Sequence, residues 1–516
     1  MLSVLVLVAC VQQGISVVHL VHDVPAEPQE RSLEDASDFT AVAVSEILPD
    51  PPKAYHWFGS SVFISDHVAI VGAPGDSDYS KFGNAYIFQR SHGSWKQVKK
   101  VAPNSPSSDD GFGSAVSIYQ GYAFVGAFKD DANGEDSGSV YYFSESSGWK
   151  QDQKLTPSDG ASLDYFGSSI GQYRREEVVV GAWGADYGGY TSCGAAYFYR
   201  YGDGMWNLEK KIVPGDAHSY QWFGISVSVY QSKAVVGAWG DSQDGSVSGA
   251  VYAYTHAMGE WQQIQKLSTG VAANHMGYSV SMYEDVLAVG LPNAYRTSLG
   301  NTNNPNAYRT GMCKVYRLTD YNHWEFEQNL VCDDCENLVS FGQSIAAAKE
   351  HIVIGLHGGT AVWNYDRYAA SGYQWTKGVY LFADRDDIDN SYFLGSTVSV
   401  YDNFVMVGVK DVYYSQSGTS DTSTAEAGIA VIFESPRTKT SISYLIQENL
   451  NLYVALYVLI VVGIAVILIG PLAVVGYNIY KQEKEAIKML EMKPFIKKPS
   501  VRSANTLRPH QSKVSM

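Results

Sequence analysis

Charged residues and cysteines are scarce in this sequence, and the common motifs of catalysis are missing. Only 17% of the 516 residues are charged and five are cysteines, whereas glycine (48) and tyrosine (37) are plentiful. This mix is typical of short strands joined by tight turns and is unlike a helical bundle or a disordered chain. No His-Glu-x-x-His motif, phosphate-binding loop or paired zinc ligands are present. We therefore expect a protein that is not an enzyme and that needs no metal or other cofactor.

Charge is distributed unevenly along the chain. The formal net charge is −16, but the segment from Tyr480 to the C-terminus carries 9 basic and 3 acidic residues. The rest of the chain therefore has 28 basic and 50 acidic residues. Because an acidic surface repels phosphates, this balance predicts that the protein does not bind nucleic acid.

A long uncharged run stands just before the basic end. Residues 452–477, LYVALYVLIVVGIAVILIGPLAVVGY, are 26 residues without a charge, and about 20 apolar residues span a bilayer. Lys481, Lys484 and Lys488 follow, as on a cytoplasmic flank. The run predicts one transmembrane helix rather than a buried core helix.

The apolar N-terminus predicts a secretion signal, so the expected topology is type I with the N-terminus outside. The predicted segments are a signal peptide (1–16), an acidic flexible N-terminal segment (17–38), a globular ectodomain (39–435), a short juxtamembrane stalk (436–450), the transmembrane helix (451–480) and a basic cytoplasmic tail (481–516).

A Phe-Gly pair followed by a Gly-Ala pair recurs along the ectodomain. The first pairs, two with Met or Leu in place of Phe, are Phe58-Gly59, Phe112-Gly113, Phe166-Gly167, Phe223-Gly224, Met276-Gly277, Phe341-Gly342 and Leu394-Gly395. The second pairs or their variants are Gly72-Ala73, Gly126-Ala127, Gly181-Ala182, Gly237-Ala238, Gly290-Leu291, Gly355-Leu356 and Gly408-Val409. The spacing from the first residue to the second Gly is 14 residues in six copies and 15 in one. Such regular spacing indicates a repeat protein.

Each repeat predicts four antiparallel strands, the last of them around a tryptophan. Seven such units predict an all-β fold, a seven-bladed β-propeller of four-stranded antiparallel blades, followed by the C-terminal transmembrane helix. A solenoid is the alternative, but its repeats are usually shorter. The small pairs would let neighbouring backbones approach closely, and each Phe would wedge between adjacent sheets. The last repeat lacks a fourth strand, so we expect residues 39–49 to complete it and close the ring.

These motifs resemble the FG-GAP repeat family, which forms the propeller head of integrin α subunits. The full name motif stands at Phe58-Gly59 and Val71 to Pro74. The resemblance implies an integrin-like binding head, but three departures distinguish the chain from an integrin α subunit. The turns between first and second strands are too short and too poor in carboxylates for calcium, long leg domains are missing, and the tail lacks Gly-Phe-Phe-Lys-Arg. These departures argue against an integrin β-type partner.

In a propeller of this strand order, the 2–3 and 4–1 connections emerge on one face, and heads of this family bind ligands there. Aromatic, arginine and aspartate side chains among small polar residues are typical of a recognition surface. The candidate residues are Trp183, Asp186, Trp239, Asp241, Tyr295, Arg296, Tyr308, Arg309, Trp363, Tyr365, Asp366, Arg367, Tyr368 and Trp375. Packing of these aromatics onto the ring is the alternative. The last six form a cluster that we assign to a 2–3 loop of the sixth unit.

Cys313 and Cys332 fall on strands that the repeat pattern pairs, so a disulfide between them is plausible, with Cys335 as a competitor. Free thiols are the alternative.

These observations together predict a single-pass plasma-membrane protein with a recognition or adhesion role. Its propeller would bind an extracellular protein or glycan ligand. The alternative is a structural or trafficking scaffold or receptor in secretory-pathway or surface-coat membranes. A propeller hydrolase is a third interpretation, which no motif supports.

Overall fold

A computed structural model describes residues 42–49, 57–75, 82–174, 176–296, 308–332, 340–349, 351–356, 359–366, 374–381, 395–409 and 428–434, and positions 478, 480–482 and 484–485. The chain divides into two units, residues 1–436 and 437–516. In the second unit the described positions are helical. Among the described residues, no helix is long and apolar enough to cross a membrane. The predicted signal peptide and residues 452–477 lie outside the described part.

Six four-stranded antiparallel sheets are each built from one continuous stretch of the first unit. Blade 1 is β2 (Ser61–Ser65), β3 (Val68–Ala73), β4 (Asn84–Ser91) and β5 (Ser94–Val101). Blade 2 is β6 (Phe112–Tyr119), β7 (Tyr122–Ala127), β8 (Ser139–Ser144) and β9 (Lys150–Leu155). Blade 3 is β10 (Ser169–Tyr173), β11 (Glu177–Ala182), β12 (Ala195–Gly202) and β13 (Met205–Ile212). Blade 4 is β14 (Ser226–Tyr230), β15 (Lys233–Ala238), β16 (Ala250–Ala257) and β17 (Glu260–Ser268).

Blade 5 is β18 (Val280–Tyr283), β19 (Val286–Leu291), β22 (Met312–Leu318) and β23 (Trp324–Leu330). Between β19 and β22 lies a small two-stranded ribbon of β20 (Tyr295–Arg296) and β21 (Tyr308–Arg309). Blade 6 is β24 (Ser344–Ala347), β25 (His351–Leu356), β26 (Gly359–Asp366) and β27 (Gln374–Leu381). The all-β propeller of four-stranded antiparallel blades is therefore confirmed.

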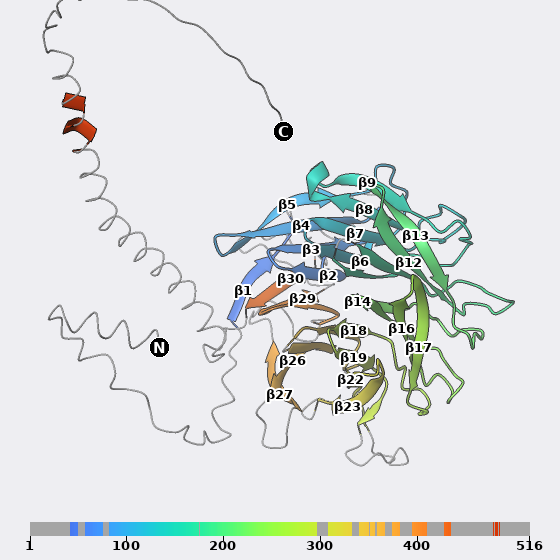
Figure 1. Ribbon diagram of the computed structural model, residues 1–516. Coiled ribbons are helices and arrows are strands. Elements are labelled where there is room, and N and C mark those ends of the chain that lie inside the picture. The colour runs from blue at the N-terminus through green and yellow to red at the C-terminus, as the bar shows by residue number, and fades with distance from the viewer. Residues whose placement is uncertain are drawn as a thin grey trace, which may run out of the picture. The chain divides into compact units, whose positions relative to one another are not determined.

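A further four-stranded sheet, here called the composite sheet, joins the two ends of the propeller. Its order is β1 (Val42–Ile47), β30 (Ile429–Glu434), β29 (Phe404–Val409) and β28 (Thr397–Tyr401). Figure 1 shows the blue N-terminal strand β1 beside the orange β30. The prediction that an N-terminal strand completes the last repeat is confirmed.

The first strand of each sheet is the innermost one. Along the chain, β2, β6, β10, β14, β18, β24 and β28 each contact the next, and β28 contacts β2 in turn. The same hydrogen bond recurs between neighbouring sheets: a serine or threonine hydroxyl, two residues after the Phe-Gly glycine, donates to the glycine carbonyl of the next sheet. The donors and acceptors are Ser61 to Gly113, Ser169 to Gly224, Ser226 to Gly277, Ser279 to Gly342, Ser344 to Gly395 and Thr397 to Gly59, at 2.8–2.9 Å. In blade 2 the equivalent residue is Ala115, which has no hydroxyl.

The glycine of each Gly-Ala pair lies directly against the next sheet. A Cβ on Gly72 would stand 1.9 Å from the carbonyl oxygen of Gly113, and one on Gly181 would stand 1.9 Å from that of Gly224. No side chain fits such a gap. The predicted reason for the small pairs is confirmed.

The hydrophobic core lies between the sheets. Phe112 packs among Val68 and Ile70 of blade 1 and Tyr141 and Phe143 of its own blade. Its ring meets that of Tyr141 edge-on, with centroids 5.4 Å apart. The Phe of the motif is thus a wedge between blades, as predicted.

Candidate functional site

The connections between strands 2 and 3 and between strands 4 and 1 lie side by side on one face, here called the loop face. The amide of Phe166 donates to the carbonyl of Ser137 in the 2–3 loop of the preceding blade, at 3.0 Å. Phe223 donates to Cys193 in the same way, also at 3.0 Å. In blades 2 to 6, the start of the first strand is therefore fixed by the loop of the preceding blade.

In the six described copies, the residue before the Phe-Gly pair or its Met-Gly variant is held in the left-handed backbone region. Its φ is +46° at Trp57, +55° at Tyr165, +54° at Trp222 and +56° at His275. This conformation costs roughly 1 kcal/mol for a residue with a Cβ, and blade 2 has Gly111 there. Large aromatic side chains at strained positions indicate a role beyond folding.

Three of these residues, with the tryptophans that follow two Gly-Ala pairs, form two groups of ring contacts, one in blade 3 and one across blades 4 and 5. Trp239 lies between Trp222 and His275, with centroid distances of 4.2 and 4.5 Å. Tyr165 stacks on Trp183 at 4.4 Å. All five side chains are half-buried. They are here called the aromatic arc.

A short ribbon extends the arc in blade 5. The repeated sequence Asn-Ala-Tyr-Arg-Thr pairs with its own copy, so that Tyr295 lies opposite Arg309. The guanidinium of Arg309 lies 4.7 Å from the centre of the Tyr295 ring. The side-chain amide of Asn293 lies 3.0 Å from Nδ1 of His275. Burial, and then the charge of Arg309, lower the pKa of His275, so its ring is neutral near pH 7.

The loop face of blades 2 to 4 is strongly acidic. Its 4–1 and 2–3 connections (102–111, 128–138, 156–168, 183–194, 213–225 and 239–249) contain twelve Asp and Glu residues and one lysine, Lys129. Burial, and then the carboxylates of Asp136 and Glu135, raise the pKa of Tyr165. The negative groups therefore act directly on the aromatic arc.

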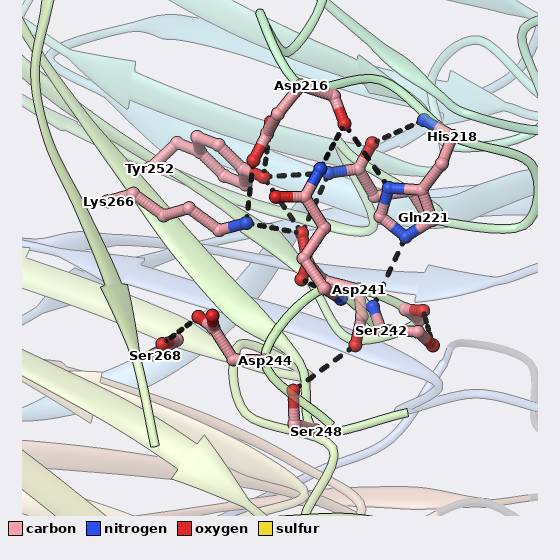
Figure 2. A network of polar contacts seen from close by, with 12 residues as sticks. Asp216, His218, Gln221, Asp241, Ser242, Asp244, Ser248, Tyr252, Lys266 and Ser268 are labelled. Carbon is pink, nitrogen blue, oxygen red and sulfur yellow. Dashed lines mark hydrogen bonds and ion pairs between the residues drawn. The ribbon is translucent and has the colours of Figure 1, made fainter. Parts of the chain in front are cut away.

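Buried carboxylates of this face are held by lysines of the fourth strands. In blade 4, Nζ of Lys266 lies 2.7 Å from Asp216 and 2.9 Å from the fully buried Asp241 (Figure 2). The hydroxyl oxygen of Tyr252 lies 2.8 Å from Asp216 and 2.9 Å from Asp241, and its single hydrogen can donate to either carboxylate. The amide of Gln221 donates to Asp241 at 2.8 Å. Although burial acts in the opposite direction, the two carboxylates raise the pKa of Lys266, so it remains charged and cannot serve as a base.

The same arrangement recurs in blade 2, where Lys154 lies 2.9 Å from Asp130 and Tyr141 donates to Asp130 at 2.6 Å. Such a repeated brace indicates a structural role for these polar groups. Within the described ranges, no group of three or more His, Cys, Asp or Glu side chains could hold a metal ion.

The structure brings part of the predicted site together. Trp183 and Trp239 lie in the aromatic arc, and Tyr295 and Arg309 lie in the adjoining ribbon. Asp241 is buried in the brace rather than presented on the surface. Asp186 is exposed, and its Oδ1 accepts the amide of Ser192 at 2.7 Å, which closes its own loop. The backbone of Arg296 lies in β20 and that of Tyr308 lies in β21.

The predicted loop cluster of the sixth unit is wrong. Trp363, Tyr365 and Asp366 belong to β26, the third strand of blade 6, and Trp375 belongs to β27, the fourth. Trp375 is only 2% exposed and packs in the core between blades 5 and 6. Its position matches the tryptophan that begins the fourth strand in the other blades, so alternating apolar residues of a strand were mistaken for a loop. The other two residues of this cluster, Arg367 and Tyr368, lie outside the described residues.

The predicted disulfide is also wrong. Cys313 is a free, buried thiol, whereas Cys332 is disulfide-bonded. Its bond is therefore to another cysteine, and the competitor Cys335 lies outside the described residues. Pairing of strands alone did not identify the right partner.

Sequence reasoning missed Tyr165, Trp222 and His275. The signal was available, because each stands directly before a Phe-Gly or Met-Gly pair. The motif itself was read as a packing device, so its preceding residue was not considered.

The fold and this face define a β-propeller with one aromatic and acidic loop surface. The FG-GAP repeat model matches four tandem stretches, residues 42–88, 95–143, 149–199 and 206–254. The chain therefore contains at least four tandem FG-GAP repeats. Each match starts in the outer strand of one sheet and ends in the third strand of the next, so the sequence repeat spans a joint between sheets. No curated protein shows significant sequence similarity to the chain.

Proposed function

We propose that this protein recognises a polypeptide ligand at the cell surface through its loop face, and that basic side chains of the ligand enter the aromatic arc. The observation that carries the proposal is the coincidence of strained, half-buried aromatics with acidic loop connections. Of the twelve acidic residues there, eight are at least partly exposed, against one lysine in the same connections.

Both features favour a cationic ligand for physical reasons. Aromatic faces attract ammonium and guanidinium groups by roughly 0.5–2 kcal/mol each. An acidic surface accelerates encounter with a basic partner. Arg309 over Tyr295 shows the same kind of contact within the chain itself. A neutral glycan would use the rings but would gain little from the carboxylates.

We propose further that the propeller is a closed ring of seven blades, the composite sheet being the seventh. The circular succession of inner-strand contacts supports this count, and so does the hydroxyl bond of Thr397 to Gly59, which repeats the bond at five other joints. A closed ring holds neighbouring loops in fixed register and leaves the arc preorganised for binding.

The membrane-anchored arrangement remains part of the proposal. The uncharged run at 452–477 and the basic tail support a single-pass anchor with the propeller outside. A scaffold or receptor role in secretory-pathway membranes is the alternative.

Binding is tested on the purified chain with an arginine nonapeptide, a glutamate nonapeptide and a neutral oligosaccharide as probes. We expect the arginine peptide alone to bind, and its affinity to fall as salt is raised. Trp222→Gly and Tyr165→Gly together should weaken binding by about fivefold or more, since two rings are lost. Tyr321→Ser is the control, because Tyr321 is 93% exposed on a 3–4 turn, away from the loop connections.

Folding should survive these glycine substitutions. Trp222→Gly loses a ring contact worth about 0.5–1.5 kcal/mol but relieves a left-handed backbone costing roughly 1 kcal/mol. Full-strength peptide binding by a folded double variant would disprove the site. Salt-independent binding of the oligosaccharide instead would assign the face to a glycan.

Location is tested with epitope tags at either end of the mature chain, viewed in intact and permeabilised cells. An N-terminal tag accessible on intact cells, with a C-terminal tag visible only after permeabilisation, is expected. A protein seen only in internal membranes would favour the scaffold alternative.

A further inference from the structure

The channel along the propeller axis ends in a collar of tyrosines on the side away from the loop face. The first strand ends with a tyrosine in blades 2, 3, 4 and 5 and in the composite sheet; these are Tyr119, Tyr173, Tyr230, Tyr283 and Tyr401. They line a cavity of about 890 Å³ together with the inner strands. Three of these tyrosines are in contact with one another in a row. The ring centroid of Tyr230 lies 4.6 Å from that of Tyr173 and 5.0 Å from that of Tyr283.

Negative charge stands next to this collar. Burial, and then neighbouring groups, raise the pKa values of Tyr230, Tyr283 and Tyr401. These groups include the carboxylate of Glu284 for Tyr230 and Tyr283, and those of Asp66 and Asp402 for Tyr401. All three carboxylates are exposed in the turns that follow the inner strands. Arg174 and Lys349 also border the cavity. The guanidinium of Arg174 already lies 5.1 Å from the centre of the Tyr173 ring, which shows that a collar ring accepts a cation.

At a gap in the collar, a buried polar atom has no partner among the described residues. Blade 1 has Ser65 where the tyrosine would stand, and this residue lines the same cavity. Ser65 is 2% exposed, and its Oγ has no hydrogen-bond partner among the described residues. Other hydroxyls lining the inner strands are satisfied: Oγ of Ser228 accepts the amide of Met282, and Oγ of Ser281 accepts that of Ala347. Because a buried polar group without a partner is unfavourable, Oγ of Ser65 is available to accept a hydrogen bond from a bound group.

The wall behind the collar is apolar. The cavity is lined from blades 1, 2, 4, 5 and 6 by Val62, Val116, Val227, Val280 and Ile345, each 7–8% exposed. Such a wall fits a hydrocarbon chain, whereas the collar fits its polar end. A cavity of this size is typical of small-molecule sites.

We propose that this end of the channel binds a primary ammonium group carried on an aliphatic chain. The ammonium lies against the tyrosine rings, donates a hydrogen bond to Oγ of Ser65 and is attracted by the turn carboxylates. The chain lies along the valine and isoleucine wall. This site is independent of the loop face, which lies at the other end of the inner strands.

The test is calorimetric titration of the full chain with hexylammonium, and with hexanol and hexanoate as neutral and anionic matches. Hexylammonium alone should bind. Tyr230→Leu should weaken it by about threefold or more, whereas Tyr230→Phe keeps the ring and should leave it within about twofold. Ser65→Ala should weaken hexylammonium but not hexyltrimethylammonium, which has no hydrogen to donate.

Tyr321→Leu is the matched control, and circular dichroism shows that each variant folds. A lysine tripeptide with blocked ends is titrated in the same way. If it binds more tightly than hexylammonium, the natural ligand is a lysine side chain of a partner protein. If it binds more weakly, the natural ligand is a free amine. Equal binding of hexanol, or no effect of Tyr230→Leu in a folded protein, would overturn the proposal.

Discussion

Asp110, two residues before the Phe-Gly pair of blade 2, is a buried carboxylate that destabilises the folded state near neutral pH. It is 3% exposed, and burial together with the charge of Asp130 raises its pKa to about 6. Because the folded pKa lies above the unfolded one, the folded state holds its proton more tightly between about pH 4 and 6, and stability falls as pH rises through this window. The amide of Ser107 donates to Oδ2 of Asp110 at 3.1 Å, a bond that asparagine can keep.

We therefore expect Asp110→Asn to stabilise the protein by about 1–3 kcal/mol at pH 7.5 and to have no effect at pH 4. Urea unfolding at the two pH values measures the difference. Asp109→Asn is the control, since Asp109 is exposed. A gain of equal size at both pH values would show that the charge is not responsible.

A substitution of Gly181 tests how closely neighbouring blades approach, because it adds a single Cβ atom between them. An added Cβ would stand 1.9 Å from the carbonyl of Gly224, and the backbone of Gly181 is not left-handed, so only the clash opposes a side chain. Gly181→Ala should cost about 3 kcal/mol or more, because two backbones must separate. Gly204 has φ +82° and nothing within 4 Å, so Gly204→Ala should cost only about 1 kcal/mol. Similar losses for both variants, measured by urea unfolding, would contradict this account.

At the scale of elements, the joint between blades 2 and 3 lacks a bond that its counterparts have. Ala115 stands where other sheets carry a serine or threonine whose hydroxyl donates to a glycine carbonyl. Ala115→Ser should restore the bond to Gly167 and stabilise the protein by about 0.5–1.5 kcal/mol. Ser226→Ala, which removes the bond to Gly277, should lose a similar amount. Thermal melting of both variants measures the two changes in stability. If Ala115→Ser destabilises the protein, the distance between the sheets at this joint differs from that at the other joints.

Strand pattern was enough to predict the four main strands of blades 1 to 5, because each blade has the two pairs and a tryptophan in fixed order, with Met-Gly and Gly-Leu as the pairs of blade 5. The prediction for blade 6 was wrong. Trp363 and Tyr365 alternate along β26 as strand residues do, but they were interpreted as binding residues of a loop. Only part of the aromatic arc was predicted, for a related reason. Trp183 and Trp239 stand out in sequence, but Trp222 and His275 gain their meaning only from ring contacts made across blades. Likewise, the cavity collar depends on residues about 50 apart in sequence meeting around an axis.

At the scale of the whole molecule, both ends of the propeller meet in one sheet. Ile47 of β1 is 3% exposed and packs in the cluster that joins the composite sheet to blade 1. Arg90 of blade 1 lies 3.0 Å from Glu434 of β30 across the same joint. Removing β1 would leave β30 with an open edge and would uncover this cluster.

We expect deletion of residues 42–47 to lower the melting temperature by roughly 5–10 °C and to promote self-association through the exposed edge. A peptide of residues 39–49, added in excess, should restore much of the loss, because strand pairing supplies the same backbone hydrogen bonds in trans. A scrambled peptide of the same composition is the control. Scanning fluorimetry and light scattering measure the two effects. An unchanged melting temperature would mean that the ring does not depend on its N-terminal strand for closure, and rescue by the scrambled peptide would mean that the register between β1 and β30 is not specific.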